Sequence, residues 1–241
     1  MRVALVSDIH GNLPALEAVV RDLEGRGVDR VVNLGDSVSG PLLPLETARF
    51  LMGTGWLHLA GNHERQVLEG GAMGASDAYA HGRLGEAEFA WLRSLPGTGR
   101  LGEAVFLCHG TPASDLVYFL ETVDGGGIRP ATAEEVEGRL GSVAAPVIAC
   151  GHSHTPRVAR TARGQLIVNP GSVGLQAFHV DEPYRHSVVN GSPEARYALL
   201  EPAGDVWEAR LLKVEYDAAP MARLAALRGR PDWERALLTG Y

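Results

Sequence analysis

The chain has 241 residues, of which 45% are hydrophobic and 21% charged, and its formal net charge is −7. This balance excludes intrinsic disorder as the main state, and it excludes a protein that holds nucleic acid chiefly through the phosphates. The two cysteines, Cys108 and Cys150, are too few for a disulfide scaffold. Because no basic leader precedes the first apolar run and no apolar stretch approaches membrane-spanning length, we expect a cytoplasmic soluble protein with no membrane partner.

The first sixty residues alternate between short apolar runs and helical patterns. Strands are predicted at 3–6, 31–34 and 56–60. Between the first two strands, apolar residues recur at helical spacing, and a second helix is predicted around 47–52. This alternation is typical of a largely parallel sheet.

The rest of the chain changes character twice. From about Glu64 to Gly102 the pattern is helical and rich in glycine. Apolar strands follow at 105–108 and 147–150, separated by a mobile loop at Gly125–Gly127 and a helix at 133–140. Strands are then predicted at 157–161, 166–168, 196–200 and 206–214, before a final helical stretch. Since no repeat or linker interrupts this order, we expect a single domain over residues 1–241.

Most of the predicted strands run into a polar cluster. Open α/β sheets bind ligands at the carboxyl ends of their strands, so these clusters are expected to converge. Their carboxylate, imidazole and amide groups suit Mn²⁺, Fe, Ni²⁺ or catalytic Zn²⁺ rather than a thiolate zinc site. Seven candidate ligands are too many for one catalytic ion and about right for two ions that share a carboxylate: Asp8, His10, Asp36, Asn62, His109, His152 and His154.

Glycines adjoin these candidates at four junctions, where a tight turn or a close backbone approach is expected. They are Gly35, Gly61, Gly110 and Gly151.

The order of these clusters resembles the signature of the calcineurin-like metallophosphoesterases, which is D-x-H, G-D, G-N-H-[DE], H and G-H-x-H. The resemblance spans residues 3 to about 173, and Asn169-Pro170-Gly171-Ser172 resembles the segment that follows in a small bacterial and archaeal, phosphodiesterase-type branch. It implies an α/β fold, a four-layer α/β/β/α sandwich with two mixed sheets and the site at one edge. The matching segments are Asp8-Ile9-His10, Gly35-Asp36, Gly61-Asn62-His63-Glu64, His109 and Gly151-His152-Ser153-His154.

The same resemblance implies a role for each candidate. It makes Asp8, His10 and His154 the ligands of one divalent ion. It makes Asn62, His109 and His152 the ligands of the other. Asp36 would bridge the two ions, and His63 would be the general acid for the departing oxygen.

The implied reaction is hydrolysis of a phosphodiester, or of a phosphomonoester, by a hydroxide bound to the metals. Mn²⁺ is the first choice of ion, with Fe, Ni²⁺ and Zn²⁺ as alternatives. The expected substrate is a small phosphoester, with nucleotides among the candidates, and no strong nucleic-acid binding is expected.

Two departures separate the chain from protein Ser/Thr phosphatases and dinucleoside tetraphosphatases, which resemble G-D-x-x-D-R-G and R-G-N-H-E. Residues 35–41 read Gly-Asp-Ser-Val-Ser-Gly-Pro, and Ala60 precedes Gly61. At the matching positions the chain therefore lacks both phosphate-binding arginines and the acid that orients the general acid. The stretch 175–194 is also unlike the shorter loops expected after N-P-G-S.

Other interpretations remain open at this point. Each Asp could be a cap, Asn62 a turn residue, and His63 a support for a ligand. The remaining histidines (His58, His81, His179 and His186) and arginines (Arg65, Arg185 and Arg196) are interpreted as ordinary, the arginines as solvated surface. The alternative function is a non-catalytic protein-interaction scaffold with the same fold.

Overall fold

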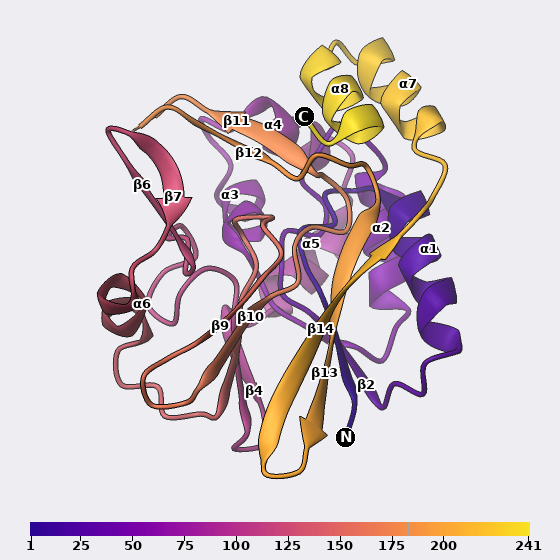
Figure 1. Ribbon diagram of the computed structural model, residues 1–241. Coiled ribbons are helices and arrows are strands. Elements are labelled where there is room, and N and C mark those ends of the chain that lie inside the picture. The colour runs from indigo at the N-terminus through magenta and orange to yellow at the C-terminus, as the bar shows by residue number, and fades with distance from the viewer. Residues whose placement is uncertain (183) are drawn as a thin grey trace.

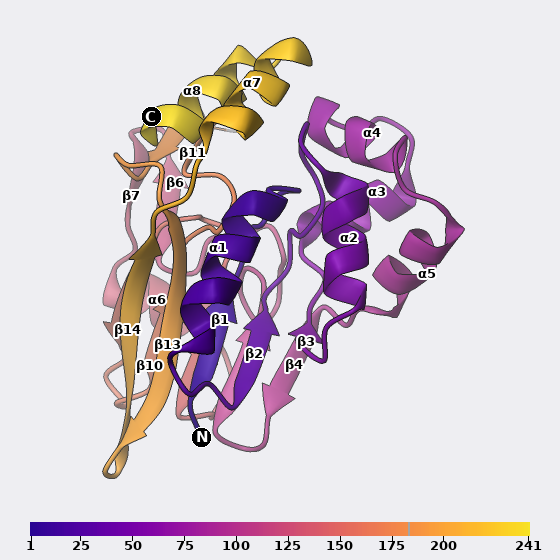
Figure 2. The same ribbon diagram turned by 90° about the vertical axis from the view of Figure 1, so that its right-hand side faces the viewer.

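Two five-stranded mixed sheets form the centre of the computed structural model, which describes residues 1–182 and 184–241 (Figures 1 and 2). The first sheet contains β1 (Val3–Val6), β2 (Arg30–Asn33), β3 (Leu57–His58), β13 (Ala195–Ala203) and β14 (Val206–Val214), in the order β14-β13-β1-β2-β3. The second contains β4 (Thr98–Leu101), β5 (Val105–Cys108), β8 (Val147–Ala149), β9 (Arg157–Arg160) and β10 (Leu166–Asn169), in the order β4-β5-β8-β10-β9. In each sheet three neighbouring strands are parallel, namely β1, β2 and β3 in the first and β5, β8 and β10 in the second.

The sheets face each other across an apolar core. Because successive side chains of a strand point to opposite faces, Val3 and Leu5 enter this core while Ala4 and Val6 face the helices. Helix α1 (Leu13–Glu24) packs on that outer face, and the side chain of Asn12 caps it by accepting a hydrogen bond from the N–H of Ala15. The helix α6 (Ala133–Leu140) packs on the outer face of the second sheet.

The remaining helices complete the outer layers. Beside β3 lie α2 (Pro44–Met52), α3 (Asn62–Glu69), α4 (Ala75–His81) and α5 (Glu86–Ser94), which share one apolar cluster with Val38 (Figure 2). The predicted helix–sheet–sheet–helix layering, with two mixed sheets, is therefore confirmed.

A hairpin and a pair of helices lie at the end of the sheets to which β1 and β2 point. Figure 1 shows the hairpin of β11 (Ala177–Val180) and β12 (His186–Val189) beside α7 (Ala219–Leu227) and α8 (Pro231–Thr239). Trp233 of α8 packs against Leu42, Leu175 and Ala177 in one buried cluster, so the helix pair is anchored next to the loops that leave β2 and β10.

Three sequence predictions were wrong in detail. The helical segment 64–102 ends earlier, because residues 98–101 form β4, an edge strand antiparallel to β5. The expected mobile loop at Gly125–Gly127 is the turn of a hairpin between β6 (Glu121–Asp124) and β7 (Gly127–Pro130). The third strand is only two residues long, since the N–H of Ala60 bonds to the carbonyl of Pro96 instead of continuing the ladder.

No helix in the described part of the chain is long and apolar enough to cross a membrane.

Candidate metal centre

The candidate side chains converge at one end of the two sheets. Asp8 and His10 follow β1, Asp36 follows β2, and Asn62 begins α3 just beyond β3. On the second sheet, His109 follows β5, and the pair His152 and His154 follows β8. Because the parallel strands of both sheets end at this edge, six of these residues form two neighbouring groups of three potential ligands, and Asn62 lies beside the second group.

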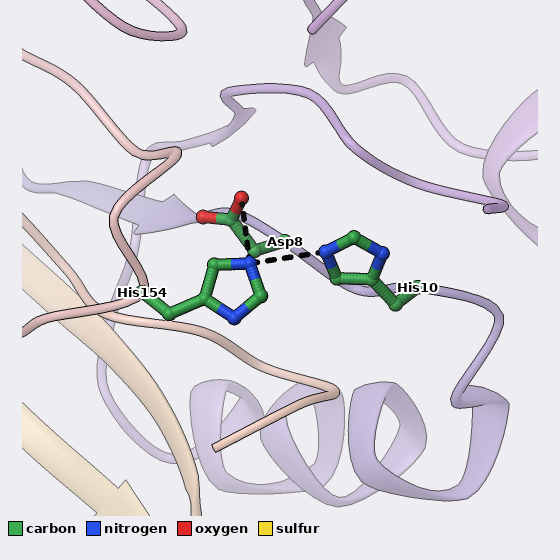
Figure 3. Close-up of side chains that lie close together, drawn as sticks. All are labelled: Asp8, His10 and His154. Carbon is green, nitrogen blue, oxygen red and sulfur yellow. Dashed lines mark hydrogen bonds and ion pairs between the residues drawn. The ribbon is translucent and has the colours of Figure 1, made fainter. Parts of the chain in front are cut away.

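The first group is Asp8, His10 and His154, whose ligand atoms all lie within 4.8 Å of one another (Figure 3). The Nε2 atoms of the two imidazoles are 3.0 Å apart, and Nε2 of His154 is 3.4 Å from Oδ1 of Asp8. All three side chains are buried. Burial is the main cause, and the positive charge of a nearby His154 the second cause, of a lowered pKa of His10, which is about 4. The imidazole of His10 therefore stays neutral.

The second group is Asp36, His109 and His152, again with ligand atoms within 4.8 Å of one another. Nε2 of His109 lies 3.1 Å from Oδ2 of Asp36 and 3.1 Å from Oδ1 of Asn62. Burial disfavours the His109 imidazolium, but the Asp36 carboxylate outweighs it and raises the pKa of His109 to about 10. A cation that binds here therefore has to displace a proton from His109.

The arrangement of donors and acceptors fits divalent cations. In His10 and His154 the Nδ1 atom lies 2.7 Å from a backbone carbonyl, of Ser39 and Leu175 respectively. A carbonyl only accepts hydrogen bonds, so each Nδ1 carries a proton and each Nε2 is the ring atom that is left to bind a cation. Oδ1 of Asp8 is buried among them without a hydrogen-bond partner. Two imidazole nitrogens and a carboxylate oxygen that converge in this way form a site that a cation would satisfy.

The backbone around the groups is held in an unusual conformation. All non-glycine residues with positive φ in the described ranges belong to the candidate ligands, and they are Asp8, His10, Asp36, His152 and His154. Left-handed backbone is costly for such residues and clusters at functional sites.

Glycine is required where these turns meet. A Cβ atom on Gly61 would lie 2.3 Å from Oδ1 of Asp36, and one on Gly151 would lie 2.0 Å from Oγ of Ser7. The expectation that glycines permit close backbone approach next to the ligands is confirmed at these two positions.

Glu64 joins two of the ligand turns, a role that the sequence did not indicate. Its buried carboxylate accepts hydrogen bonds from the backbone N–H groups of Asp36, Ser37 and Gly61, at 2.8, 2.7 and 2.7 Å. Charge-assisted bonds of this kind are about twice as strong as neutral ones. Glu64 therefore fixes the loop after β2 against the start of α3.

His63 lies at the edge of the first group and is held by an acid from another helix. Its ring centroid is 5.4 Å from that of His10, and its Nδ1 atom is 2.7 Å from Oδ1 of Asp77 on α4. Burial disfavours the His63 imidazolium, but the carboxylates of Asp36 and Asp77 outweigh it and raise its pKa to about 9. His63 therefore has an acidic partner 14 residues further along the chain, whereas the position that carries an acid in the Ser/Thr phosphatases holds none.

A cavity of about 1120 Å³ opens over both groups. Aromatic rings pack against three of the candidate imidazoles. The ring centroids are 6.0 Å apart for Trp233 and His10, 4.6 Å for Phe178 and His154, and 4.8 Å for Tyr118 and His152. These rings come from α8, from the hairpin β11–β12 and from the loop after β5. The stretch 175–194, which differed from the expected short loop, therefore supplies a wall of the cavity.

The histidines outside the signature have separate environments. Nδ1 of His81 faces the carbonyl of Val67, His179 lies beside Ser187, and His58 lies beside Thr54. Both His179 and His186 line the cavity, and the Nε2 atom of His186 is 3.2 Å from the hydroxyl of Tyr118.

Of the three arginines interpreted as solvated surface, one is buried. Arg196 donates hydrogen bonds to Gln176, to Oγ of Ser192 and to backbone carbonyls. These bonds fix the segment between β12 and β13. Arg65 forms an ion pair with Asp115, and Arg185 is exposed at the mouth of the cavity.

Cys108 and Cys150 are fully buried free thiols that pack with apolar residues below α6, and burial raises the pKa of both. Both therefore act as small hydrophobic residues of the core.

Comparisons with known proteins agree with this geometry. A family model described as the calcineurin-like phosphoesterase superfamily domain matches residues 1–189. An uncharacterised protein of Methanocaldococcus jannaschii is 22% identical over 260 aligned residues, covering 96% of this chain and 94% of its own. The crystal structure of a metallophosphoesterase from Sphaerobacter thermophilus is 25% identical with a TM-score of 0.77, covering 100% of this chain and 99% of that chain. A hypothetical protein from Pyrococcus horikoshii OT3, 20% identical with a TM-score of 0.74 over 100% of this chain and 98% of its own, shares the fold. The chain belongs to the calcineurin-like phosphoesterase superfamily.

Proposed function

We propose that the chain is a phosphoric ester hydrolase that uses two divalent cations and prefers phosphodiesters. Asp8, His10 and His154 would hold one cation. Asn62, His109 and His152 would hold the other, with Asp36 between the two. The observation that carries the proposal is the first group, in which two imidazole Nε2 atoms and a carboxylate oxygen without a hydrogen-bond partner face one another in a buried site.

Bound divalent cations would supply charge neutralisation at the phosphate and lower the pKa of the attacking water. The chain's own part is to hold the ligand atoms of the first group in place. The carbonyls of Ser39 and Leu175 hold the protons on the Nδ1 atoms of His10 and His154, so that both Nε2 atoms are free to bind. Mn²⁺ is the first choice because the donors are imidazole, carboxylate and amide groups without a thiolate, and Fe, Ni²⁺ and Zn²⁺ suit them as well.

His63 is the proposed general acid. Its Nδ1 atom is bound to Asp77, so its Nε2–H is the proton available for transfer. When the ester bond breaks, the leaving oxygen takes the bonding electron pair and the proton of His63, and phosphorus gains the oxygen of one water molecule. His63 regains a proton from solvent, and the products are an alcohol and a phosphomonoester.

The cavity supports a substrate larger than inorganic phosphate. Its volume of about 1120 Å³ and its aromatic walls suit a small organic phosphoester, and a nucleotide is the substrate that we propose first. A formal net charge of −7 argues against a polymeric nucleic acid as the substrate.

A screen of mono-, di- and cyclic nucleotides with added Mn²⁺, run beside bis(p-nitrophenyl) phosphate, tests the proposal. We expect hydrolysis of the diester and about two tightly bound cations per chain by elemental analysis. The alternative is a protein-interaction scaffold of the same fold. A preparation with no tightly bound transition metal and no hydrolysis of any of these esters would support the scaffold.

A further inference from the structure

Several exposed apolar side chains line the cavity. Among the large apolar residues that are exposed, Leu116, Val117, Tyr184, Val189 and Tyr241 all line it, with exposed fractions of 55, 43, 48, 51 and 56%. We call these five residues the apolar rim. Single exposed apolar residues need no explanation, but several that line one cavity over a polar site indicate a surface that a ligand covers.

The rim is attached to the second ligand group by a pair of side chains. Nδ1 of His186 lies 2.8 Å from the carbonyl of Tyr184 and therefore carries a proton. Nε2 of His186 then accepts a hydrogen bond from the hydroxyl of Tyr118, at 3.2 Å. Since the ring of Tyr118 also packs against His152, the loop after β5 and the hairpin β11–β12 are joined beside that candidate ligand.

The proposed general acid lies beside the other ligand group. His63 packs against His10, whereas Tyr118 packs against His152. In a hydrolysis with His63 as the acid, the leaving oxygen lies next to His63. Leu116 and Val117 of the rim precede Tyr118 in the same loop, so they lie on the side of the cavity that the substituent retained on phosphorus would occupy.

We propose that the apolar rim binds this retained substituent and that the substituent is a bulky aromatic group. The inference rests on the proposed function and adds the substrate class. A phosphomonoester carries no retained substituent and leaves the rim uncovered, while a diester with an aromatic retained group covers it. Tyr184 and Tyr241 offer exposed rings for stacking, and Val189 and Leu116 offer aliphatic surface.

The test keeps the leaving group constant and varies only the retained one. Methyl p-nitrophenyl phosphate, phenyl p-nitrophenyl phosphate and thymidine 5′-(p-nitrophenyl phosphate) all release p-nitrophenolate. With Mn²⁺ present, we expect kcat/KM to be roughly tenfold or more higher for the phenyl than for the methyl ester, since even one methylene in an apolar pocket is worth about tenfold. Comparing the thymidine ester with the phenyl ester shows whether the rim prefers a nucleoside or a simple aryl group.

Val189→Ser and Tyr184→Ser should lower the phenyl-to-methyl ratio and leave kcat/KM for the methyl ester nearly unchanged. Both side chains are about half exposed, at 51 and 48%, so the fold does not depend on them. Val206→Ser is the matched control, because Val206 is also a strand valine, is 50% exposed, and lies outside the cavity lining.

The outcomes separate the inference from the function on which it rests. Hydrolysis of the methyl and phenyl esters at equal kcat/KM, or an unchanged ratio in both variants, would overturn the inference and leave the hydrolase intact. If none of the three esters reacts with Mn²⁺ bound, the proposed function itself fails and the inference fails with it.

Discussion

The Nδ1 atom of His63 lies 2.7 Å from Oδ1 of Asp77, which joins the start of α3 to the start of α4. Asp77 is buried and His63 is partly exposed toward the cavity. A carboxylate at Nδ1 fixes both the tautomer and the direction of the ring, so that the opposite N–H points away from the acid. We propose that Asp77 is the positioning residue for the proposed general acid.

Replacing Asp77 tests this pairing. In Asp77→Asn the amide keeps the size of the side chain but removes the charge that orients His63. We expect kcat for an alkyl-leaving diester to fall about 10- to 100-fold, the range usual for partners that orient a catalytic or metal-binding imidazole. Metal content, measured in the same samples, should be unchanged.

A matched control is Glu69→Gln, which changes an exposed acid at the end of α3 whose contact with Arg65 is long, at 3.5 Å. If Asp77→Asn loses metal, Asp77 supports a ligand instead. An unaltered kcat would show that His63 needs no partner.

Much of the fold was predictable because local signals and tertiary packing agree. Val3–Val6, Val105–Cys108 and Val147–Ala149 are apolar throughout, as strands covered on both faces must be, and all three are central strands. The hairpins at 121–130 and 177–189 were missed because their patterns are mixed and their order depends on distant partners. One such distant partner of the second hairpin is Tyr118, which contacts His186 although the two are 68 residues apart in sequence.

The candidate site also has features that the sequence predicted and features that only tertiary packing creates. The spacing of the signature predicted that the two ligand groups would meet, since each member directly follows a strand. Asp77 could not be predicted, because it lies on a separate short helix and its link to His63 exists only after α3 and α4 pack together. The role of Glu64 was hidden for a similar reason, since its partners are backbone groups of another loop.

Removal of the metals should affect both activity and stability. After long dialysis against EDTA we expect hydrolysis to stop and Tm to fall, because the folded state then loses the cations that bind between His10 and His154. A cation at a hundred times its Kd stabilises the folded state by about 2.7 kcal/mol. Added Mn²⁺ should restore both quantities, as measured by diester hydrolysis and differential scanning fluorimetry. Full activity in excess EDTA would exclude the two-cation mechanism.

The cysteines should matter for stability and not for turnover. Burial raises the pKa of Cys108 and of Cys150, so neither forms a reactive thiolate at neutral pH. In the double variant with alanine at both positions we expect a loss of about 1 kcal/mol of unfolding free energy per site, measured by urea denaturation, with kcat little changed. Single variants serve as controls. A drop in metal content would mean that the thiols support the site after all.

Asp36→Asn should abolish both metal binding and turnover. Oδ2 of Asp36 faces His109 at 3.1 Å, and Oδ1 accepts the backbone N–H of His63 at 3.0 Å. Asparagine keeps the shape but removes the negative charge that two neighbouring cations would share. Elemental analysis and diester hydrolysis measure the two effects, with Asp115→Asn, which breaks an ion pair outside both ligand groups, as the control. A variant that keeps two cations would show that Asp36 does not bridge them.

His63→Ala separates proton delivery from metal binding. The change removes the proposed acid and no candidate ligand, so two cations should remain bound. General acid catalysis contributes about 10²–10⁴-fold, and a loss of that size in kcat is expected for a diester with an alkyl leaving group, which departs poorly without a proton. With p-nitrophenolate, which departs readily as an anion, the loss should be much smaller.

The decisive quantity is therefore the difference between the two substrates, measured on the same preparations with metal content quantified. His81→Ala is the matched control, because His81 bonds only to the carbonyl of Val67 and does not line the cavity. Equal losses on both substrates, with the cations still bound, would mean that His63 positions the phosphate or the attacking water. Loss of a cation would make the His63 side chain a ligand or the support of one.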